Sequence, residues 1–140
     1  MLLHVIRYEV IASFEFILSL NYVAGKFQSC WTNLDMYHDN REHEAYINFL
    51  ANKYPDRIEI FEIGNSFENR SLKVIKIGEK QRESPKHAIW MQAGIHAREW
   101  ISPATVAHMI YQLVESISGE EKLVLANFDI YVLSIVNPDG

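Results

Sequence analysis

The stretch from Ala88 to Val136 constrains the fold most, because it places a helix between two buried strands. Residues 88–93 form an apolar run of strand length. Ser102 is then a good N-cap and Pro103 a good first helical residue. Residues 129–136 are almost continuously apolar and β-branched, which is typical of a strand covered on both faces. A strand, a helix and a strand at this spacing predict a crossover that joins two parallel strands.

The part of the chain before this unit predicts a helix and a hairpin. Asp39 and Glu42 have capping-box spacing, an apolar stripe of helical period follows, and Pro55 ends the helix. Two short strand-like runs come next, with a polar loop between them. The predicted strands are residues 57–63 and 72–77, with a hairpin loop at 64–71; residues 120–127 are predicted to be a short helix or turn. We therefore expect one α/β domain.

A histidine and a carboxylate follow the first strand of the crossover unit. His96 and Glu99 are three residues apart on the turn that leaves the strand, so both side chains can point into one small volume. Asn137 follows the second strand, and ligands of open α/β sheets bind at the carboxyl ends of the strands. A His-x-x-Glu pair on a surface loop arises easily by chance, but its place between Gly94 and a capped helix favours a site. The pair would supply two of the three protein ligands of a catalytic zinc.

Composition excludes several classes of protein. The chain has 140 residues and a formal net charge of -5. Its sequence contains no cluster of Lys and Arg, so it lacks the basic patch that is typical of nucleic-acid-binding proteins. Cys30 is the one cysteine, which excludes an internal disulfide framework. The uncharged run 16–25 is too short for a membrane span, which needs ~20 apolar residues. It fits the core of a signal peptide, so residues 1–30 are a possible signal-like leader or an unassigned segment, and we expect an extracellular protein.

Other conspicuous side chains receive structural interpretations. His108 falls on the polar stripe of its helix and is expected to be solvated. His38 and His43 flank the start of the first helix, where capping or surface roles are expected. The Pro-Asp-Gly sequence at Asp139 predicts a turn. Three aromatic residues in or beside strands are expected in the core rather than in a binding platform: Trp90, Phe128 and Tyr131.

Several motifs together resemble the zinc metallocarboxypeptidases of the carboxypeptidase A/B type. Gly94–Ile101 resembles the first metal-binding motif of that family, and Asn137–Gly140 resembles its next signature. The segments 36–38 and 63–71 are similar to the start of the mature catalytic domain. The resemblance covers about residues 31–140, with the motifs in the family's order.

This resemblance implies an α/β/α sandwich with a mixed, partly parallel sheet, of which residues 31–140 would be a partial catalytic domain. It implies a Zn²⁺-dependent exopeptidase that acts on the C-termini of peptides or proteins. His96 and Glu99 would be zinc ligands, and Arg98 a substrate-binding arginine. The family's third ligand, a histidine, and its general-base glutamate lie beyond Gly140, so no catalytic residue is assigned and the chain alone is expected to be inactive.

Two alternatives remain open. One is another His-x-x-Glu zinc hydrolase, of the aspartoacylase-like type, and the other is a non-catalytic fragment. Trp100 and the loop at 64–71 favour the peptidase.

Overall fold

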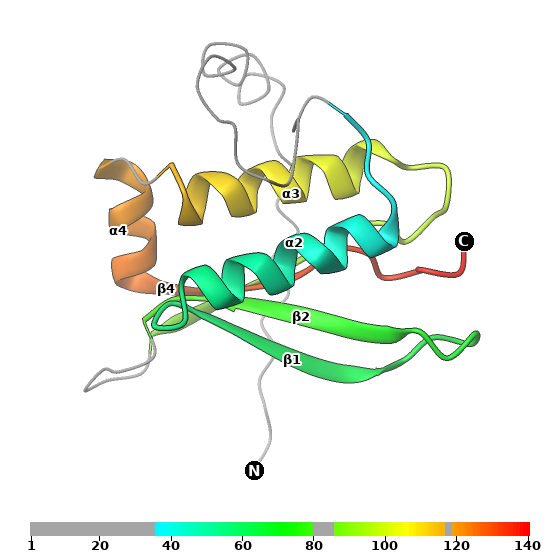
Figure 1. Ribbon diagram of the computed structural model, residues 1–140. Helices are drawn as coiled ribbons and strands as arrows, with labels where there is room; N and C mark the ends of the chain where they lie inside the picture. The colour runs from blue at the N-terminus through cyan, green and yellow to red at the C-terminus, as the bar shows by residue number, and fades with distance from the viewer. Residues whose placement is uncertain (1–35, 80–85, 117–118) are drawn as a thin grey trace. The chain divides into compact units, whose positions relative to one another are not determined.

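The computed structural model describes residues 36–79, 86–116 and 119–140 (Figure 1). The elements in chain order are α2 (Asn40–Lys53), β1 (Ile58–Asn65), β2 (Ser71–Ile77), β3 (His87–Gln92), α3 (Ile101–Val114), α4 (Gly119–Asn127) and β4 (Phe128–Leu133). All of them belong to one compact unit, Leu34–Gly140. The predicted leader and Cys30 lie outside the described residues. None of the described helices has the length and apolarity that crossing a membrane requires.

The four strands form one mixed sheet in the order β1-β2-β4-β3. β1 and β2 are an antiparallel hairpin, and β4 pairs antiparallel with β2. On its other side β4 pairs in parallel with β3, the strand that precedes it in the chain. This confirms the predicted α/β class, the partly parallel sheet and the parallel crossover. β4 is an inner strand because neighbours pair along both of its edges.

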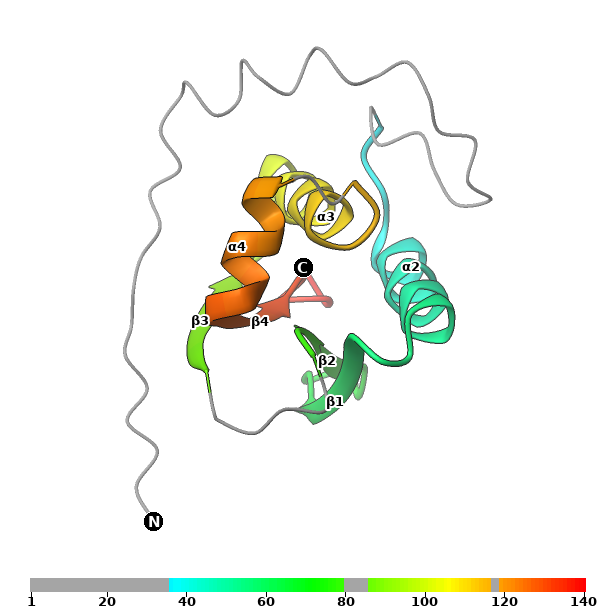
Figure 2. The same cartoon turned by 90° about the vertical axis from the view of Figure 1, so that its left-hand side faces the viewer.

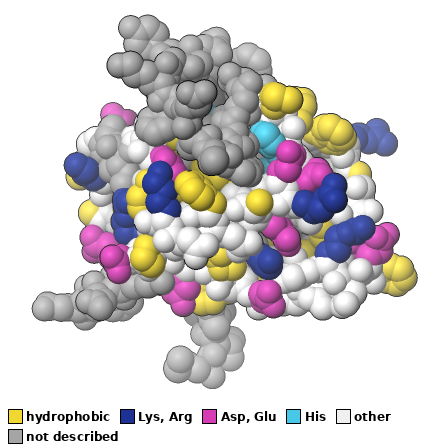
Figure 3. Space-filling model, in the orientation of Figure 1, with side chains coloured by type: hydrophobic (Ala, Val, Ile, Leu, Met, Phe, Trp, Pro, Cys, Tyr) yellow, Lys and Arg dark blue, Asp and Glu magenta, His cyan; other side chains and the backbone are white. Residues whose placement is uncertain are grey.

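Helices α2 and α3 lie over the same face of the sheet, as two views at right angles show (Figures 1 and 2). Side chains alternate between the faces along a strand. One set of strand residues therefore points at the helices and forms the core with them. The fully buried side chains of this core are Leu50 from α2, Ile110 from α3, and Ile58, Ile75, Ile77 and Val132 from the sheet. On the face seen in Figure 3, basic and acidic side chains are interspersed.

The local predictions for α2 and the hairpin are confirmed. The Glu42 N–H donates to Asp39 Oδ1 at 2.9 Å, and the Asp39 N–H donates to Glu42 Oε2 at 2.8 Å, which completes the capping box. The helix ends at Lys53, and Tyr54, before the proline, is its C-cap. The ends of β1 and β2 lie within two residues of the predicted strands. These features depend on neighbours in sequence, which explains why they could be predicted.

Two predicted element ends are wrong. α3 begins at Ile101, with Trp100 as its N-cap residue, so Ser102 is inside the helix. The Ser102 hydroxyl accepts the Gly94 N–H at 3.1 Å and donates to the Glu99 carbonyl at 2.9 Å, so it joins the loop to the helix instead of capping it. β4 ends at Leu133, opposite Gln92, rather than at residue 136. The next N–H of this segment that bonds to the chain after β3 belongs to Val136, which donates to the Ala93 carbonyl at 2.9 Å, so the regular ladder is interrupted after Leu133.

Several side chains differ from their predicted environments, among them Phe128 and Tyr131, which were expected in the core and are only half-buried. His43 is only 3% exposed, so it is not a surface residue. Burial lowers its pKa to about 4, and the nearby His38 adds to this effect. Trp90 is 38% exposed and not in the core, because β3 is an edge strand and Trp90 pairs with Tyr131 on the face away from Ile89. Helix periodicity showed that His43 adjoins an apolar stripe, but not which neighbours would cover it.

Candidate metal centre

The loop that carries the site follows β3, and Gly94 is its second residue. Gly94 has φ +61, and a Cβ on it would lie 3.2–3.3 Å from Ile135 and Pro103. Its carbonyl accepts the Asn137 N–H at 3.0 Å, and its own N–H donates to Ser102. Glycine takes this left-handed conformation without steric cost and permits the close approach. The start of the loop is therefore held by both α3 and the segment after β4.

His96 and Glu99 meet on this loop. His96 Nδ1 lies 2.7 Å from Glu99 Oε1, and the Glu99 N–H donates to the His96 carbonyl at 3.0 Å. The side chains are 71% and 48% exposed, respectively, so solutes can reach both. The backbone turn between them explains why a spacing of three residues brings the imidazole and the carboxylate together. The contact predicted from their spacing is present.

An open hollow of about 680 Å³ surrounds this pair. The exposed Arg98 is part of its wall, and so is Asn137 from the segment after β4. The residues that line it are Ile95, His96, Ala97, Arg98, Glu99 and Asn137. The structure thus brings the three site residues predicted from the sequence to one edge of the sheet, beside the ends of β3 and β4.

The donor set fits part of a zinc site. Imidazole nitrogen and carboxylate oxygen are common zinc ligands, with bonds of roughly 2.1 Å that place two tetrahedral ligands roughly 3.4 Å apart. His96 Nδ1 and Glu99 Oε1 are somewhat closer, at hydrogen-bond distance, so a small rotation of either side chain would admit an ion in place of the shared proton. Among residues 36–79, 86–116 and 119–140, no cluster of three or more His, Cys, Asp or Glu is present. The described residues therefore offer two ligands.

His108 lies on α3, the helix that follows the loop, and does not contact His96 or Glu99. Its ring contacts Gln112 at 3.1 Å and packs near Tyr111, one turn or less away along α3. His87 is at the start of β3, at the opposite end of the strand from His96. His108 was expected to be solvated, but it is half-buried.

Asp139 has a role that the sequence did not reveal. Its carboxylate accepts the Ser66 hydroxyl at 2.8 Å and the Glu68 N–H at 2.9 Å, and it pairs with Arg70. Desolvation raises the pKa of Asp139, but these hydrogen bonds and the Arg70 charge outweigh it and hold the pKa below its usual value. The turn signal at Asp139 was visible, whereas its partners lie about seventy residues away in the chain and had no sequence signal.

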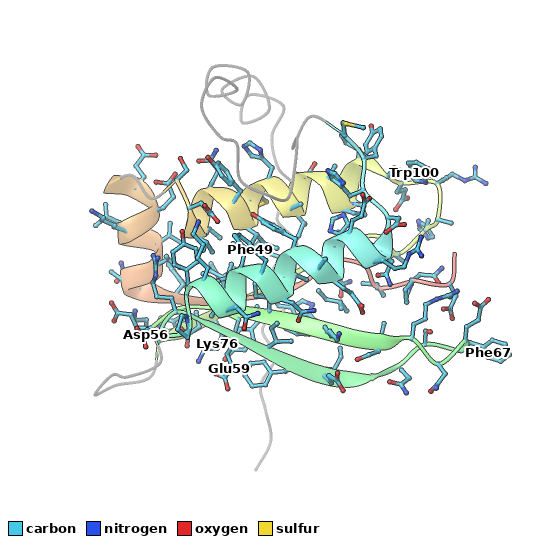
Figure 4. All side chains as sticks on the ribbon, viewed as in Figure 1. Phe49, Asp56, Glu59, Phe67, Lys76 and Trp100 are labelled. Atoms are coloured by element: carbon cyan, nitrogen blue, oxygen red, sulfur yellow. The ribbon has the colours of Figure 1, made fainter. Side chains whose placement is uncertain are left out.

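Trp100 lies where the loop joins α3 (Figure 4). It is 63% exposed, and its ring meets Tyr37 edge to face, with centroids 5.8 Å apart. Such an arrangement is favourable for two aromatic rings. The contact ties the segment before α2 to the start of α3, next to Glu99.

Comparison with known proteins gives a consistent result. A sequence model described as zinc carboxypeptidase matches residues 43–140. Carboxypeptidase B of Astacus astacus is 37% identical over 110 residues, which are 79% of this chain and 34% of that protein. Carboxypeptidase A from Helicoverpa armigera superimposes with a TM-score of 0.73 at 29% identity, over 90% of this chain and 32% of that one. The structure of thrombin activatable fibrinolysis inhibitor gives a TM-score of 0.71 at 33% identity, over 76% of this chain and 27% of that one. The chain therefore spans between a quarter and a third of the length of these similar proteins.

Proposed function

This chain belongs to the zinc carboxypeptidase family, and from that premise we propose that the protein removes C-terminal residues from peptides in a zinc-dependent reaction. The observation that carries the proposal is the 2.7 Å approach of His96 Nδ1 to Glu99 Oε1 in the hollow beyond β3. Zinc, when bound, supplies Lewis acidity, which polarises a carbonyl group and lowers the pKa of water. No observation favours the aspartoacylase-like alternative.

His96 and Glu99 are proposed to hold the ion. Metal binding requires the imidazole nitrogen and the carboxylate to be free of protons, and the 2.7 Å separation of Nδ1 from Oε1 brings the two donor atoms to one place. The turn closed by the Glu99 N–H and the His96 carbonyl keeps both side chains on one side of the loop. The two side chains therefore lose little conformational entropy when the ion binds.

Arg98 is proposed to bind the peptide substrate. It lies between the two ligands in sequence and contributes to the wall of the same hollow. A guanidinium group presents several N–H donors in a fixed plane, so it can bind carbonyl or carboxylate oxygens of a peptide chain. Asn137, which also lines the hollow, adds a further amide to this polar surface.

The ligand assignment can be tested by measuring bound zinc and peptidase activity in the purified whole protein. We expect His96→Ala and Glu99→Ala each to lose most of the zinc and the activity. His87→Ala and Glu62→Ala are matched controls at exposed positions outside the hollow, and both should retain zinc. Full zinc content in His96→Ala would refute the assignment. Arg98→Ala should keep its zinc and raise the KM for peptides.

We also propose that the protein is secreted, on the basis of the uncharged run 16–25 with its small residues Val23, Ala24 and Gly25. Fusion of residues 1–30 to a reporter protein tests this directly. Appearance of a shortened reporter in the medium is the expected result, and retention of the intact fusion inside the cells would contradict it.

A further inference from the structure

The loop between β1 and β2 contains an acceptor sequence for N-linked glycans. Asn69, Arg70 and Ser71 match the pattern Asn-x-Ser with a residue other than proline in the middle. No other asparagine of the chain is followed two residues later by serine or threonine. The motif includes none of the residues that line the hollow at the candidate metal centre.

The backbone presents Asn69 at the tip of the hairpin. The Asn69 N–H donates to the Ser66 carbonyl at 3.0 Å, and the Ser66 N–H donates to the Arg70 carbonyl at 2.8 Å. Asn69 is exposed and has φ +62, so it occupies the left-handed position of a three-residue hairpin loop. Asparagine is one of the few residues with a side chain that adopts this conformation readily. The Oδ1 atom of Asn69 accepts a hydrogen bond from the side chain of Asn65. This bond does not involve Nδ2 of Asn69, which is the atom that carries a glycan.

A second feature of the loop points to a sugar. Phe67 is 102% exposed and extends away from the molecule at the end of the hairpin (Figure 4). It precedes Asn69 by two residues, so the turn brings both side chains to the same tip. The C–H groups on one face of a pyranose ring are attracted to the negative face of an aromatic ring. We propose that Asn69 is N-glycosylated and that the first N-acetylglucosamine of the glycan packs against Phe67.

Ser71 fits a role before the chain folds. The glycan is transferred to an extended nascent chain, in which the hydroxyl of the serine is accessible to the transferase. In the folded chain Ser71 Oγ is buried and has no hydrogen-bond partner among the described residues. Hydrogen bonding within the fold therefore does not account for a hydroxyl at this position. A role of the hydroxyl in the transfer of the glycan to Asn69 does account for it.

The transfer step needs a lipid-linked oligosaccharide pyrophosphate as donor. A bond forms between Asn69 Nδ2 and the anomeric carbon of N-acetylglucosamine, and the bond between that carbon and the pyrophosphate oxygen breaks. The lipid pyrophosphate leaves with the electron pair, and the amide nitrogen loses one proton to a base of the transferase. The step requires entry into the secretory pathway and does not depend on the proposed peptidase activity.

The acceptor role can be tested by translating the full chain, behind a cleavable secretory leader, in the presence of endoplasmic-reticulum microsomes. Protection from added protease identifies translocated chains, whether or not they fold. We expect a mobility shift that peptide N-glycanase removes, absent from Asn69→Gln and Ser71→Ala and present in Ser71→Thr and Asn65→Gln. Protease-protected wild-type chains without the shift would overturn the proposal.

The contact with Phe67 is tested on protein secreted from eukaryotic cells and trimmed to one N-acetylglucosamine. We expect this sugar to raise the melting temperature relative to Asn69→Gln, and we expect Phe67→Ala to abolish the increase. The four proteins form a double-mutant cycle, which isolates the interaction between ring and sugar. An equal increase with and without Phe67 would show that the sugar does not pack on the ring.

Discussion

At the scale of single residues, His43 is a titratable side chain that the fold buries. The folded chain keeps this imidazole buried, with a pKa of about 4 against 6.5 for an exposed histidine. Desolvation is the main cause and the charge of His38 the second, while Glu42 and Asp39 act in the opposite direction. A neutral histidine in this position is compatible with the apolar residues of α2 around it.

This environment makes stability depend on pH. Below pH 6.5 the unfolded chain binds a proton at His43 that the folded chain does not bind until about pH 4. Stability therefore falls as the pH decreases through this window, by about 3 kcal/mol at most. Denaturant unfolding at several pH values should show the loss in the wild type and a much smaller slope in His43→Leu. His87→Gln, at an exposed position, should keep the wild-type slope.

Gly94 is the residue whose backbone shapes the site. Gly94→Ala would place a side chain in the left-handed region, at a cost of about 1–2 kcal/mol. It would also press the new Cβ against Ile135 and Pro103. We expect a lower unfolding midpoint, together with weaker zinc binding in the whole protein. Gly119→Ala is the matched control, because nothing lies within 4 Å of its Cβ and it has no positive φ; a similar loss there would contradict this explanation.

At the scale of elements, Asp139 holds the β1–β2 hairpin against the segment after β4. Its carboxylate accepts from Ser66 and Glu68 and pairs with Arg70, so it bridges elements that are distant in sequence. Because its folded pKa is lowered, this contribution is present above the ordinary value of 3.8 and disappears as the pH falls through the folded pKa.

Removing this charge should loosen the hairpin loop. In Asp139→Asn we expect faster hydrogen exchange at the Glu68 amide and a lower melting temperature, since an amide group replaces one accepting oxygen with a donor. Asp56→Asn, an exposed aspartate at the other end of the hairpin (Figure 4), serves as the control. Unchanged exchange at Glu68 in Asp139→Asn would mean that the loop holds its shape without the carboxylate.

At the scale of the whole molecule, the two described ligands limit the affinity for zinc. A catalytic zinc site has three protein ligands and one open position. We therefore expect the purified 140-residue chain to bind zinc more weakly than micromolar. Titration with zinc against a competing chelator measures this. Sub-micromolar binding that disappears in His96→Ala would reveal a third ligand.

Sequence alone determined what depends on near neighbours. The capping box of α2, the hairpin, the strand before Gly94 and the pairing of His96 with Glu99 all join residues a few positions apart, so local geometry specifies them. The motifs around His96 and Asn137 also identified the family, which the comparisons confirm. Arg98 was assigned only through the resemblance to that family, and the hollow does include it.

Only the tertiary structure decided how the elements cover one another. β4 enters between β2 and β3, His43 becomes buried, and Asp139 pairs with the hairpin loop. Periodicity in a sequence states which face of an element is apolar, but not which other element packs against it. These outcomes depend on contacts between segments that are far apart in the chain, and they are stable only when the whole core forms at once.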